Sequence, residues 1–464
     1  MARVTFSGAC GTVTGSCTVL TWGDTSILVD CGLYQGPDEL EQRNWESFGF
    51  AAHQLDAVVL THAHLDHTGR LPKLVAEGFD GPIYCTKPSR GLVSLILQDS
   101  GHLQEEQARY AAKKGYSRHR DPKPLYTAKD ARATLKKIQP LSFDDRHEIV
   151  PGVSLRYRRA GHLLGAASIE IRGKDSDGER RTWLFSGDVG RYGVPILKDP
   201  EPPLDESASL VLESTYDDRD HRETDPEADF RAAIVRVFGR GGTVVIPAFA
   251  LGRTQEVLYH LSALVDDGVL DPDVVFLDSP MAIKATDLYR RAKDEHDEEL
   301  AELVEHQMSG LNPDRFNYCR SVEQSKALNR RRKPAVIVAA SGMATGGRVV
   351  HHLKQLLPKQ RNAVIFVGYQ AGGTRGRALV NGARTVGIHG EVVPVKAEIQ
   401  SLHGLSAHAD RDELLRWCDA LPAKPQRIFL NHGEDPARKA LAAALIERGF
   451  PRPELPLSGE SHRW

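Results

Sequence analysis

The stretch THAHLDHTGR, residues 61–70, places three histidines and one aspartate within six residues, directly after the apolar run AVVL. His62 and His64 are two positions apart, so in an extended chain their side chains point to the same side. A turn or helix that begins after His64 would bring Asp66 and His67 beside that pair. Imidazole nitrogens and carboxylate oxygens suit zinc, iron or manganese. The stretch therefore predicts the start of a two-metal site at a strand end, to which the fold has to bring further ligands.

Three further candidate ligands stand in the same setting, at the ends of apolar strands. His162 lies in RRAGHLLGAAS, Asp188 follows the apolar run of TWLFSGDVGR, and His432 follows that of RIFLNHGE. A carboxylate such as Asp188 can bridge two cations. Each of the three also has a plain interpretation, as a surface or core histidine or as a turn residue. Their repeated position at strand ends favours a shared metal site.

The pattern of predicted strands and helices changes along the chain. Its first third consists of glycine-punctuated strands, which predict hairpins and mixed α/β structure with much antiparallel pairing. Four later segments, which begin GTVVIP, DVVFLD, PAVIVA and NAVIFV, each repeat strand, loop and helix, and so predict parallel βαβ units. After these segments the strand pattern of the first third returns. We expect a first domain of residues 1–215, an inserted domain of residues 216–394, and a segment of residues 395–464 that completes the first.

Composition limits the classes of partner. The 464 residues are too many for one core, and the net charge of −2 gives no global basic field for nucleic acid or membrane. Six scattered cysteines without a CxxC pair argue against a disulfide framework and a cysteine zinc site. Neither a transmembrane run nor a signal-peptide core is found. We therefore expect a cytoplasmic protein without a membrane partner.

The order DCG, HAHLDH, AGHLLGAAS and SGDVGR resembles the metallo-β-lactamase superfamily. The continuation ESTY, SAHAD and NHGE is similar to its β-CASP branch of RNA- and DNA-processing nucleases. The resemblance spans nearly the whole chain and is nearest to bacterial ribonucleases and to the endonuclease subunit of the cleavage and polyadenylation machinery. It implies a metallo-β-lactamase αββα sandwich with an inserted parallel-sheet α/β domain, the β-CASP domain. It also implies a zinc-dependent ribonuclease.

The resemblance further implies the ligand sets of two zinc ions, with manganese as the alternative metal. The first set is His62, His64 and His162, the second is Asp66, His67 and His432, and Asp188 bridges the two ions. Asp30, in LVDCG, would support these ligands without binding metal.

It also implies a catalytic pair outside the metal ligands. Glu213, in VLESTY, would orient His408, in SAHAD, and His408 would contact the scissile phosphate and protonate the leaving oxygen. Histidine titrates in the right range for this, and a neighbouring carboxylate raises its pKa and selects its tautomer. Two zinc ions would convert a bridging water to hydroxide at neutral pH, and Asp66 would orient that hydroxide or take its proton.

Two glycine-rich loops in the inserted domain are candidates for phosphate or RNA binding. ASGMATGGR (residues 340–348) and YQAGGTRGR (residues 369–377) each follow a predicted parallel strand and lead into a helix, whose N-terminal N–H groups favour phosphate oxygens. The candidate contacts are Ser341, Gly342, Arg348, Arg375 and Arg377. The alternative is that these glycines only serve tight turns. Neither loop has the GxxxxGK[ST] pattern of a nucleotide triphosphatase.

The expected reaction is hydrolysis of phosphodiester bonds in single-stranded RNA. A DNA nuclease, a small-substrate hydrolase and a non-catalytic RNA-binding subunit are the alternatives. The pair of His408 and Glu213 disfavours the small-substrate reading, because ester or amide cleavage has no evident use for that acid. The complete ligand set disfavours the silent subunit. Endonuclease and exonuclease modes share these ligands, so both stay open, as do the RNA preference and a homodimer.

Overall fold

The computed structural model describes residues 2–114, 122–174, 178–215, 226–306, 308, 310–368, 370–402 and 406–463. They form two compact units. Unit 1 comprises Met1–Tyr192, Asp199–Asp220 and His408–Trp464, and unit 2 comprises Gly193–Lys198 and His221–Ala407. Each unit has its own hydrophobic cores.

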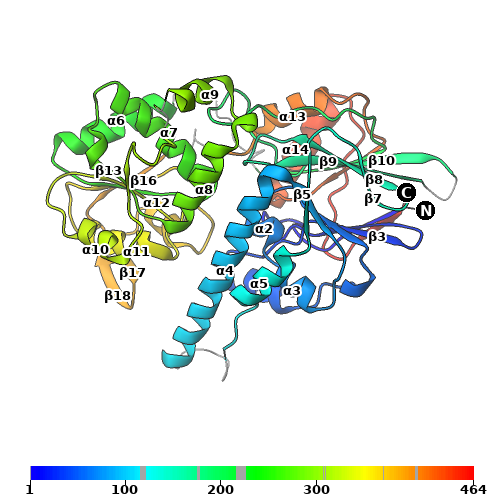
Figure 1. Cartoon of the computed structure of the whole chain (residues 1–464), viewed down its shortest axis with the longest axis horizontal. Helices are drawn as coiled ribbons and strands as arrows, with labels where there is room; N and C mark the ends of the chain where they lie inside the picture. The colour runs from blue at the N-terminus through cyan, green and yellow to red at the C-terminus, as the bar shows by residue number, and fades with distance from the viewer. Residues whose placement is uncertain are drawn as a thin grey trace. The chain divides into compact units, whose positions relative to one another are not determined.

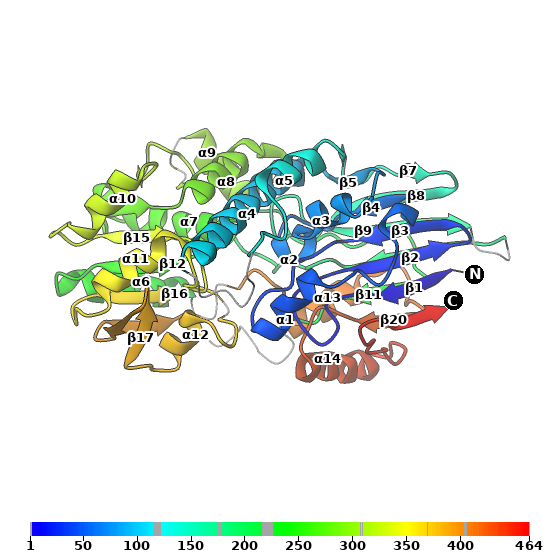
Figure 2. The same ribbon diagram turned by 90° about the horizontal axis from the view of Figure 1, so that it is seen from below.

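Unit 1 contains two sheets. Among the described residues the first has the order β21 (Ser461–Arg463), β1 (Arg3–Phe6), β2 (Thr18–Trp22), β3 (Thr25–Val29), β4 (Ala57–Val59), β5 (Ile83–Thr86) and β6 (Ile138–Leu141). The second has the order β20 (Arg427–Leu430), β11 (Ser209–Leu212), β10 (Arg180–Phe185), β9 (Ala167–Lys174), β8 (Val153–Arg159) and β7 (His147–Val150). Strands β1, β2 and β3 pair antiparallel, as the glycine-punctuated pattern predicts. The two ends of the chain meet where β1 pairs with β21 (Figure 2).

The two sheets of unit 1 pack face to face. Their shared core includes Phe6, Val59, Trp183 and Phe429, all at most 1% exposed. The helices and short 3-10 helices of this unit are α1 (Asp38–Gln42), η1 (Arg43–Trp45), η2 (Ala52–Gln54), α2 (Leu65–Thr68), α3 (Leu71–Ala76), α4 (Lys87–Lys114), α5 (Ala128–Leu135), α13 (Arg411–Asp419) and α14 (Asp435–Glu447). Helices α13 and α14 cover the second sheet, while α3, α4 and α5 lie on the side of the first (Figure 1). This is the αββα sandwich predicted from the sequence.

Unit 2 is built on a parallel sheet. Its order among the described residues is β14 (Asn317–Tyr318), β13 (Val275–Leu277), β15 (Val336–Ala339), β12 (Val244–Pro247), β16 (Ala363–Phe366) and β19 (Glu398–Ser401). A separate hairpin pairs β17 (Thr385–Ile388) with β18 (Glu391–Pro394). The four predicted strand–loop–helix segments are β12 with α7 (Arg253–Asp266), β13 with α8 (Pro280–Arg291), β15 with α11 (Gly347–Leu356), and β16 with α12 (Arg375–Val380).

Helices cover both faces of this parallel sheet. They are α6 (Pro226–Gly239), α7 (Arg253–Asp266), α8 (Pro280–Arg291), α9 (Glu298–Glu305), α10 (Val322–Asn329), α11 (Gly347–Leu356) and α12 (Arg375–Val380), with η3 (Pro272–Val274) and η4 (Lys293–Glu295). Figure 1 shows helices on both sides of the sheet. Alternate strand residues face opposite sides: Val244 and Ile246 pack against α6 and α7, whereas Val245 packs against α11. Burial on both sides explains why these strands are continuous apolar runs.

The limits of unit 2 differ from those expected for the inserted domain. The sequence predicts an end at residue 394, but unit 2 continues to Ala407 because β19 pairs in parallel with β16 and extends its sheet. Unit 2 also takes Gly193–Lys198, where the backbone N–H of Ile196 donates to Asp297. Both additions are short segments whose neighbours are distant in sequence.

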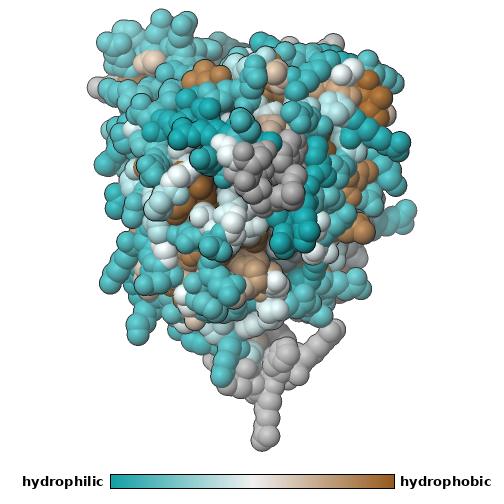
Figure 3. All heavy atoms as spheres, turned by 90° about the vertical axis from the view of Figure 1, so that its right-hand side faces the viewer, coloured by the Kyte–Doolittle hydropathy of each residue, from teal (hydrophilic) through white to brown (hydrophobic). Residues whose placement is uncertain are grey.

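The described helices include none that is long and apolar enough to cross a membrane. The face shown in Figure 3 is mostly hydrophilic, and its hydrophobic residues form small separate patches.

One glycine fixes how the loop after β3 packs on α2. The N–H groups of Cys31 and Leu33 donate to the carbonyls of His67 and Leu65, at 2.7 Å each. Gly32 lies between these two bonds, and a Cβ there would overlap the carbonyl oxygen of Asp66. Its backbone lies outside the left-handed region, so close approach and not backbone conformation requires the glycine.

We expect Gly32→Ala to lower the unfolding midpoint and the bound metal together, because the loop and α2 would have to separate. The cost of such overpacking is about 1–3 kcal/mol. Thermal unfolding and elemental analysis measure the two effects. Gly239→Ala is the control, since that glycine meets nothing within 4 Å. A Gly32→Ala protein with wild-type midpoint and metal content would contradict the close-packing argument.

Candidate metal centre

The candidate site of unit 1 lies where strands of both sheets end. Strands β3 and β4 are parallel neighbours in the first sheet, and β10, β11 and β20 are parallel neighbours in the second. Strand β8 runs parallel to β10 because each is antiparallel to β9. The residues that follow these strands are Asp30 after β3, His62 after β4, His162 after β8, Asp188 after β10, Glu213 after β11 and His432 after β20. Their side chains therefore meet at one edge.

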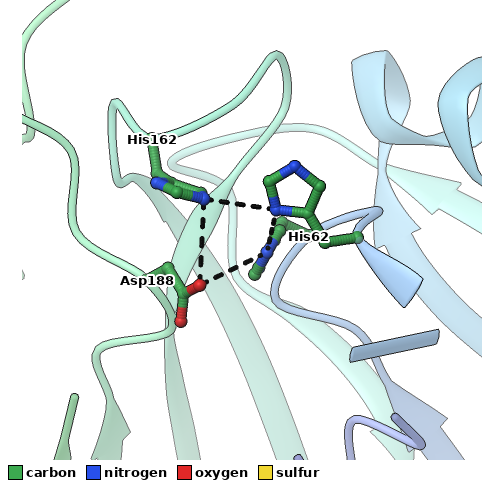
Figure 4. Close-up of side chains that lie close together, drawn as sticks. His62, His162 and Asp188 are labelled. Carbon is green, nitrogen blue, oxygen red and sulfur yellow. Dashed lines mark hydrogen bonds and ion pairs between the residues drawn. The ribbon is translucent and has the colours of Figure 1, made fainter. Parts of the chain in front are cut away.

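A first group of ligand atoms consists of His62 Nε2, His64 Nδ1 and His162 Nε2. His64 Nδ1 lies 3.1 Å from His62 Nε2 and 3.3 Å from His162 Nε2. The three side chains lie with Asp188 in a cluster whose ligand atoms are all within 4.8 Å of one another. Figure 4 shows His62, His162 and Asp188 pointing toward one another.

A second group consists of Asp66, His67 and His432. His67 Nε2 lies 3.2 Å from His432 Nε2, which lies 3.6 Å from Asp66 Oδ2. Helix α2, which begins directly after His64, turns Asp66 and His67 toward this side, as the sequence predicts. His67 is 2% exposed, whereas the side chain of Asp66 is 20% exposed and so reaches solvent.

The carboxylate of Asp188 lies between the two groups. Its Oδ2 is 3.6 Å from His62 Nε2 and 3.8 Å from His162 Nε2. Its Oδ1 is 3.4 Å from His67 Nε2 and 3.5 Å from His432 Nδ1. Oδ1 is buried and has no direct hydrogen-bond partner within the part of the chain that the structure describes. One carboxylate thus presents one oxygen to each group, which is the arrangement of a bridging ligand.

These distances fit metal ions better than direct hydrogen bonds. Two atoms bound tetrahedrally at zinc distances lie about 3.3–3.6 Å apart. The nitrogen pairs at 3.1–3.3 Å and the carboxylate contacts at 3.4–3.8 Å are close to that spacing. A buried oxygen such as Asp188 Oδ1 needs a partner, and a cation between the groups supplies one. The side chains present therefore fit a metal centre with nitrogen and oxygen ligands.

Asp30 contacts the second group through the ring of His67. Its Oδ2 lies 2.7 Å from His67 Nδ1, and its Oδ1 accepts the backbone N–H of Thr61 at 2.8 Å. Because a carboxylate accepts hydrogen bonds, this contact keeps a proton on Nδ1 of His67 and turns Nε2 toward the metal position. Thr61 Oγ1 also donates to Asp30 Oδ2 at 2.8 Å and lies 3.1 Å from His62 Nδ1. Asp30 therefore lies where the sequence suggests a supporting carboxylate.

Two of these residues have left-handed backbone conformations. The φ angle is 59° at Asp30 and 53° at His432. Such a conformation is costly for residues other than glycine. At His432 it is held by hydrogen bonds, because its N–H donates to Ala9 O at 2.9 Å and its carbonyl accepts from Ser214 N at 3.2 Å.

The charges of the site respond to this burial. Burial, together with the neighbouring histidines, lowers the pKa of His62 well below its usual value. Burial also opposes a charge on His67, but the carboxylates of Asp188 and Asp30 outweigh it and raise the pKa of His67 well above the usual range. A cation that binds Nε2 of His67 therefore has to displace a proton.

The expected pair of His408 and Glu213 lies beside the metal position. His408 Nδ1 is 3.2 Å from Glu213 Oε2, and 3.9 Å from Asp188 Oδ2. Burial lowers the pKa of His408, but the Glu213 carboxylate outweighs it, so the net pKa is raised. The side chain of His408 is 19% exposed, whereas that of Glu213 is 1% exposed. The histidine can thus reach a bound molecule while the glutamate stays inside.

Two threonines of the site were missed by sequence reasoning. Thr61 bridges Asp30 and His62, as described above. Thr215 Oγ1 donates to Glu213 Oε2 at 2.7 Å and lies 3.2 Å from His432 Nδ1, so it connects Glu213 with the second group. Their positions in THAHLDH and ESTY are the only sequence signal for them.

Two arginines predicted to bind phosphate are engaged within unit 2. Arg348 Nη1 donates to Asp278 Oδ1 at 2.6 Å and to the carbonyl of Cys319 at 2.9 Å. Arg375 donates to the carbonyls of Gly387 and Ala344. Asp278 is fully buried and also accepts from Ser325 and His352. Both guanidinium groups thus hold neighbouring segments of unit 2 together by hydrogen bonds.

The other predicted phosphate contacts lie on the same edge of unit 2. Ser341 Oγ accepts the N–H of Thr345 at 3.2 Å, within the turn that follows β15. Gly342 is buried in that turn. The N–H of Arg377 donates to Thr374 Oγ1 at the start of α12. Tyr369, the first residue of the second predicted loop, lies outside the described residues.

Comparison with known proteins agrees with this geometry. Residues 10–233 match the Metallo-beta-lactamase superfamily, residues 254–379 the Beta-Casp domain, and residues 392–451 the Zn-dependent metallo-hydrolase RNA specificity domain. Ribonuclease TTHA0252 of Thermus thermophilus is 39% identical, over 96% of each chain. The chain belongs to the β-CASP branch of the metallo-β-lactamase superfamily.

Further relatives of this β-CASP protein lie in archaea. Transcription termination factor FttA of Methanocaldococcus jannaschii is 32% identical, over 93% of this chain and 67% of the factor. A crystal structure of a protein of unknown function from Enterococcus faecalis V583 has a TM-score of 0.55 and 15% identity, and the match covers 99% of both chains. At that identity it supports the fold alone.

We expect Asp188→Ala to lose metal from both groups, because each group would lack its shared oxygen. The metal content measured by elemental analysis of the purified protein should fall well below that of the wild type. Asp145→Ala, at an exposed aspartate of the same unit, should keep the wild-type content. Full occupancy in Asp188→Ala would contradict the bridging position.

Arg348→Ala should lower the unfolding midpoint, because it leaves the buried carboxylate of Asp278 without its guanidinium partner. Breaking such a pair costs about 3 kcal/mol or more. Arg332→Ala, at an exposed arginine of the same unit, is the control and should leave the midpoint unchanged. If Arg348→Ala instead keeps the wild-type midpoint and binds RNA more weakly, Arg348 binds phosphate, as the sequence predicts.

Proposed function

We propose that this protein is a zinc-dependent ribonuclease that hydrolyses phosphodiester bonds of single-stranded RNA. Two zinc ions would be held by the two ligand groups, with Asp188 between them and manganese as the alternative metal. The observation that carries the proposal is the Asp188 carboxylate, which presents one oxygen to each histidine group. The match to a Zn-dependent metallo-hydrolase RNA specificity domain and the likeness to a named ribonuclease support RNA as the substrate.

Bound zinc would activate water for attack on phosphorus and neutralise charge on the phosphate. Asp66 would orient the attacking water, because its carboxylate is partly exposed beside the second group. The hydrogen bond of Asp66 to His432 and its neighbouring histidines outweigh burial and lower its pKa to about 2, so it stays ionised at neutral pH.

His408 would supply the proton for the leaving oxygen. Its Nδ1 faces Glu213, and Nε2 would be the atom that donates to substrate. Glu213 is itself held by the backbone N–H of Val189 at 2.5 Å and by Thr215 at 2.7 Å. A fixed carboxylate orients the imidazole and favours its protonated form, as a general acid requires. This pair distinguishes the proposed reaction from ester or amide hydrolysis.

The turn after β15 is our candidate for further phosphate contacts. Ser341 and the exposed backbone at Gly346 and Gly347 are its accessible polar groups. Binding there would be local, since the net charge of the chain is −2. The six free cysteines support a reducing, cytoplasmic setting for the proposed reaction.

The substrate is tested with single-stranded RNA labelled at its 5′ end, matched DNA, and a circular RNA of the same sequence. We expect cleavage of the linear RNA and not of the DNA. Cleavage of the circle identifies endonuclease action, whereas a resistant circle with a shortened linear strand identifies exonuclease action. Zinc-loaded protein that cuts neither polymer would overturn the proposed function in favour of a small-substrate hydrolase or an RNA-binding subunit.

His408→Ala should keep its zinc and lose RNA cleavage by roughly 100- to 10,000-fold, because it removes a general acid that is not a ligand. Elemental analysis and the cleavage rate on the labelled RNA measure the two quantities. His53→Ala, at an exposed histidine outside the site, should match the wild type in both. Zinc loss in His408→Ala would assign His408 to the metal instead.

A further inference from the structure

A large hydrophobic residue is exposed at the edge of unit 2 where its parallel strands end. Phe249 follows β12 and is 38% exposed. The residues around it in the chain are buried, since Ala248 is 0% and Ala250 is 4% exposed. A phenylalanine side chain gains about 1.5–3 kcal/mol when fully buried. Single exposed hydrophobic residues are common, so the surroundings of Phe249, and not its exposure alone, carry the argument.

The backbone that carries this ring is fixed. The carbonyl of Phe249 accepts the N–H of Thr254 at 3.1 Å and its hydroxyl at 2.8 Å. The preceding residue, Ala248, donates its N–H to the carbonyl of Ala339 in β15. The first turn of α7 and the neighbouring strand thus hold Phe249 from both sides. The exposed ring does not belong to a loose loop.

Two glycines from neighbouring turns face the ring. A Cβ on Gly342 would lie 2.7 Å from Cδ2 and 2.9 Å from Cε2 of Phe249, so any side chain there would displace the ring. A Cβ on Gly368 would lie 4.0 Å from Cε2. Neither glycine has a left-handed backbone, so conformation does not require them. The backbone of Gly342 therefore lies directly against the ring, and Arg253 Nε lies near the same position at Gly368.

Gln370 ties the two glycine turns together under this surface. Its Nε2 donates to the carbonyl of Gly342 at 3.1 Å and to that of Gly368 at 3.0 Å. Gln370 is 4% exposed. Ser341 and Thr345, the hydroxyl pair of the candidate phosphate turn, lie in the same turn as Gly342. A fixed aromatic ring, flat glycine backbone and hydroxyl groups therefore lie together.

We propose that Phe249 stacks on an unpaired base of the RNA. The inference rests on the proposed function and extends it from the metal centre to a base contact in unit 2. A single flat ring beside glycine backbone fits a planar base, and the adjacent hydroxyls and N–H groups fit the phosphate of the same nucleotide. Stacking accepts any base, because every base has a π face, so Phe249 adds affinity without strong sequence preference.

Binding is measured by fluorescence anisotropy of labelled single-stranded RNA at fixed salt, in the His408→Ala background so that the RNA is not cut. Phe249→Leu keeps the apolar character and removes the ring, and Phe249→Trp keeps a ring. We expect Phe249→Leu to raise Kd roughly 5- to 100-fold and Phe249→Trp to restore it. Thermal midpoint and zinc content should stay at the wild-type values in both variants.

A second measurement uses RNAs that carry one abasic site at successive positions. At one position, removal of the base should lower the RNA affinity of the protein that has Phe249. The same removal should change the RNA affinity of Phe249→Leu little. Wild-type affinity in Phe249→Leu, or additive effects at every position, would overturn the stacking role.

The two proposals fail in distinguishable ways. RNA that is bound through Phe249 but not cut by the zinc-loaded protein overturns the ribonuclease proposal and supports the base contact. RNA that is cut by the wild type and bound equally by Phe249→Leu overturns only the base contact. Absence of RNA binding by every variant overturns both.

Discussion

The two oxygens of Asp188 face different histidine groups while the side chain is only 2% exposed. A buried carboxylate has to be paired with positive charge or hydrogen-bond donors, and among the described residues Oδ1 faces only histidine nitrogens, at 3.4 Å and 3.5 Å. A pair of cations satisfies both oxygens at once. The candidate ligands come from strand ends of two sheets: one set follows β4 in the first sheet, and the others follow β8, β10 and β20 in the second. The sandwich is thus held in register at the edge where its chemistry would occur.

Two residues of the site have left-handed backbone conformations that place their side chains toward Asp188 and the histidines. Asp30 and His432 both adopt left-handed conformations, and Gly32 allows the loop after β3 to contact the backbone of α2. Hydrogen bonds from Thr61 to Asp30, and between His432 and Ala9, keep these conformations in place. Strain that is maintained in this way is typical of sites that must present side chains in a fixed geometry. The pair of His408 and Glu213 lies beside these residues, with His408 Nδ1 3.9 Å from Asp188 Oδ2.

In a basic groove, arginines face solvent. In unit 2, two arginines contact groups inside the unit, and an aromatic ring is exposed. The guanidinium of Arg348 lies against the buried carboxylate of Asp278, and that of Arg375 donates to backbone carbonyls. What the edge exposes is instead a ring, Phe249, beside the backbone of Gly342. An uncharged base contact is compatible with a chain whose net charge is −2, because stacking needs no long-range field.

Local patterns in the sequence determined much of this protein. The apolar runs that end in DCG, HAHLDH, AGH, SGD and NHG identified the strands and the side chains that cluster at their ends, because strand ends at one sheet edge bring such residues together. The repeated strand–helix segments identified the parallel sheet. Tertiary structure alone decided that Glu398–Ser401 joins that sheet, that Arg348 and Arg375 turn inward, and that Thr61 and Thr215 support the ligands. It also decided that Phe249 meets Gly342. The physical reason is that each of these outcomes depends on a partner distant in the chain, and neither the periodicity nor the composition of a segment specifies its partner.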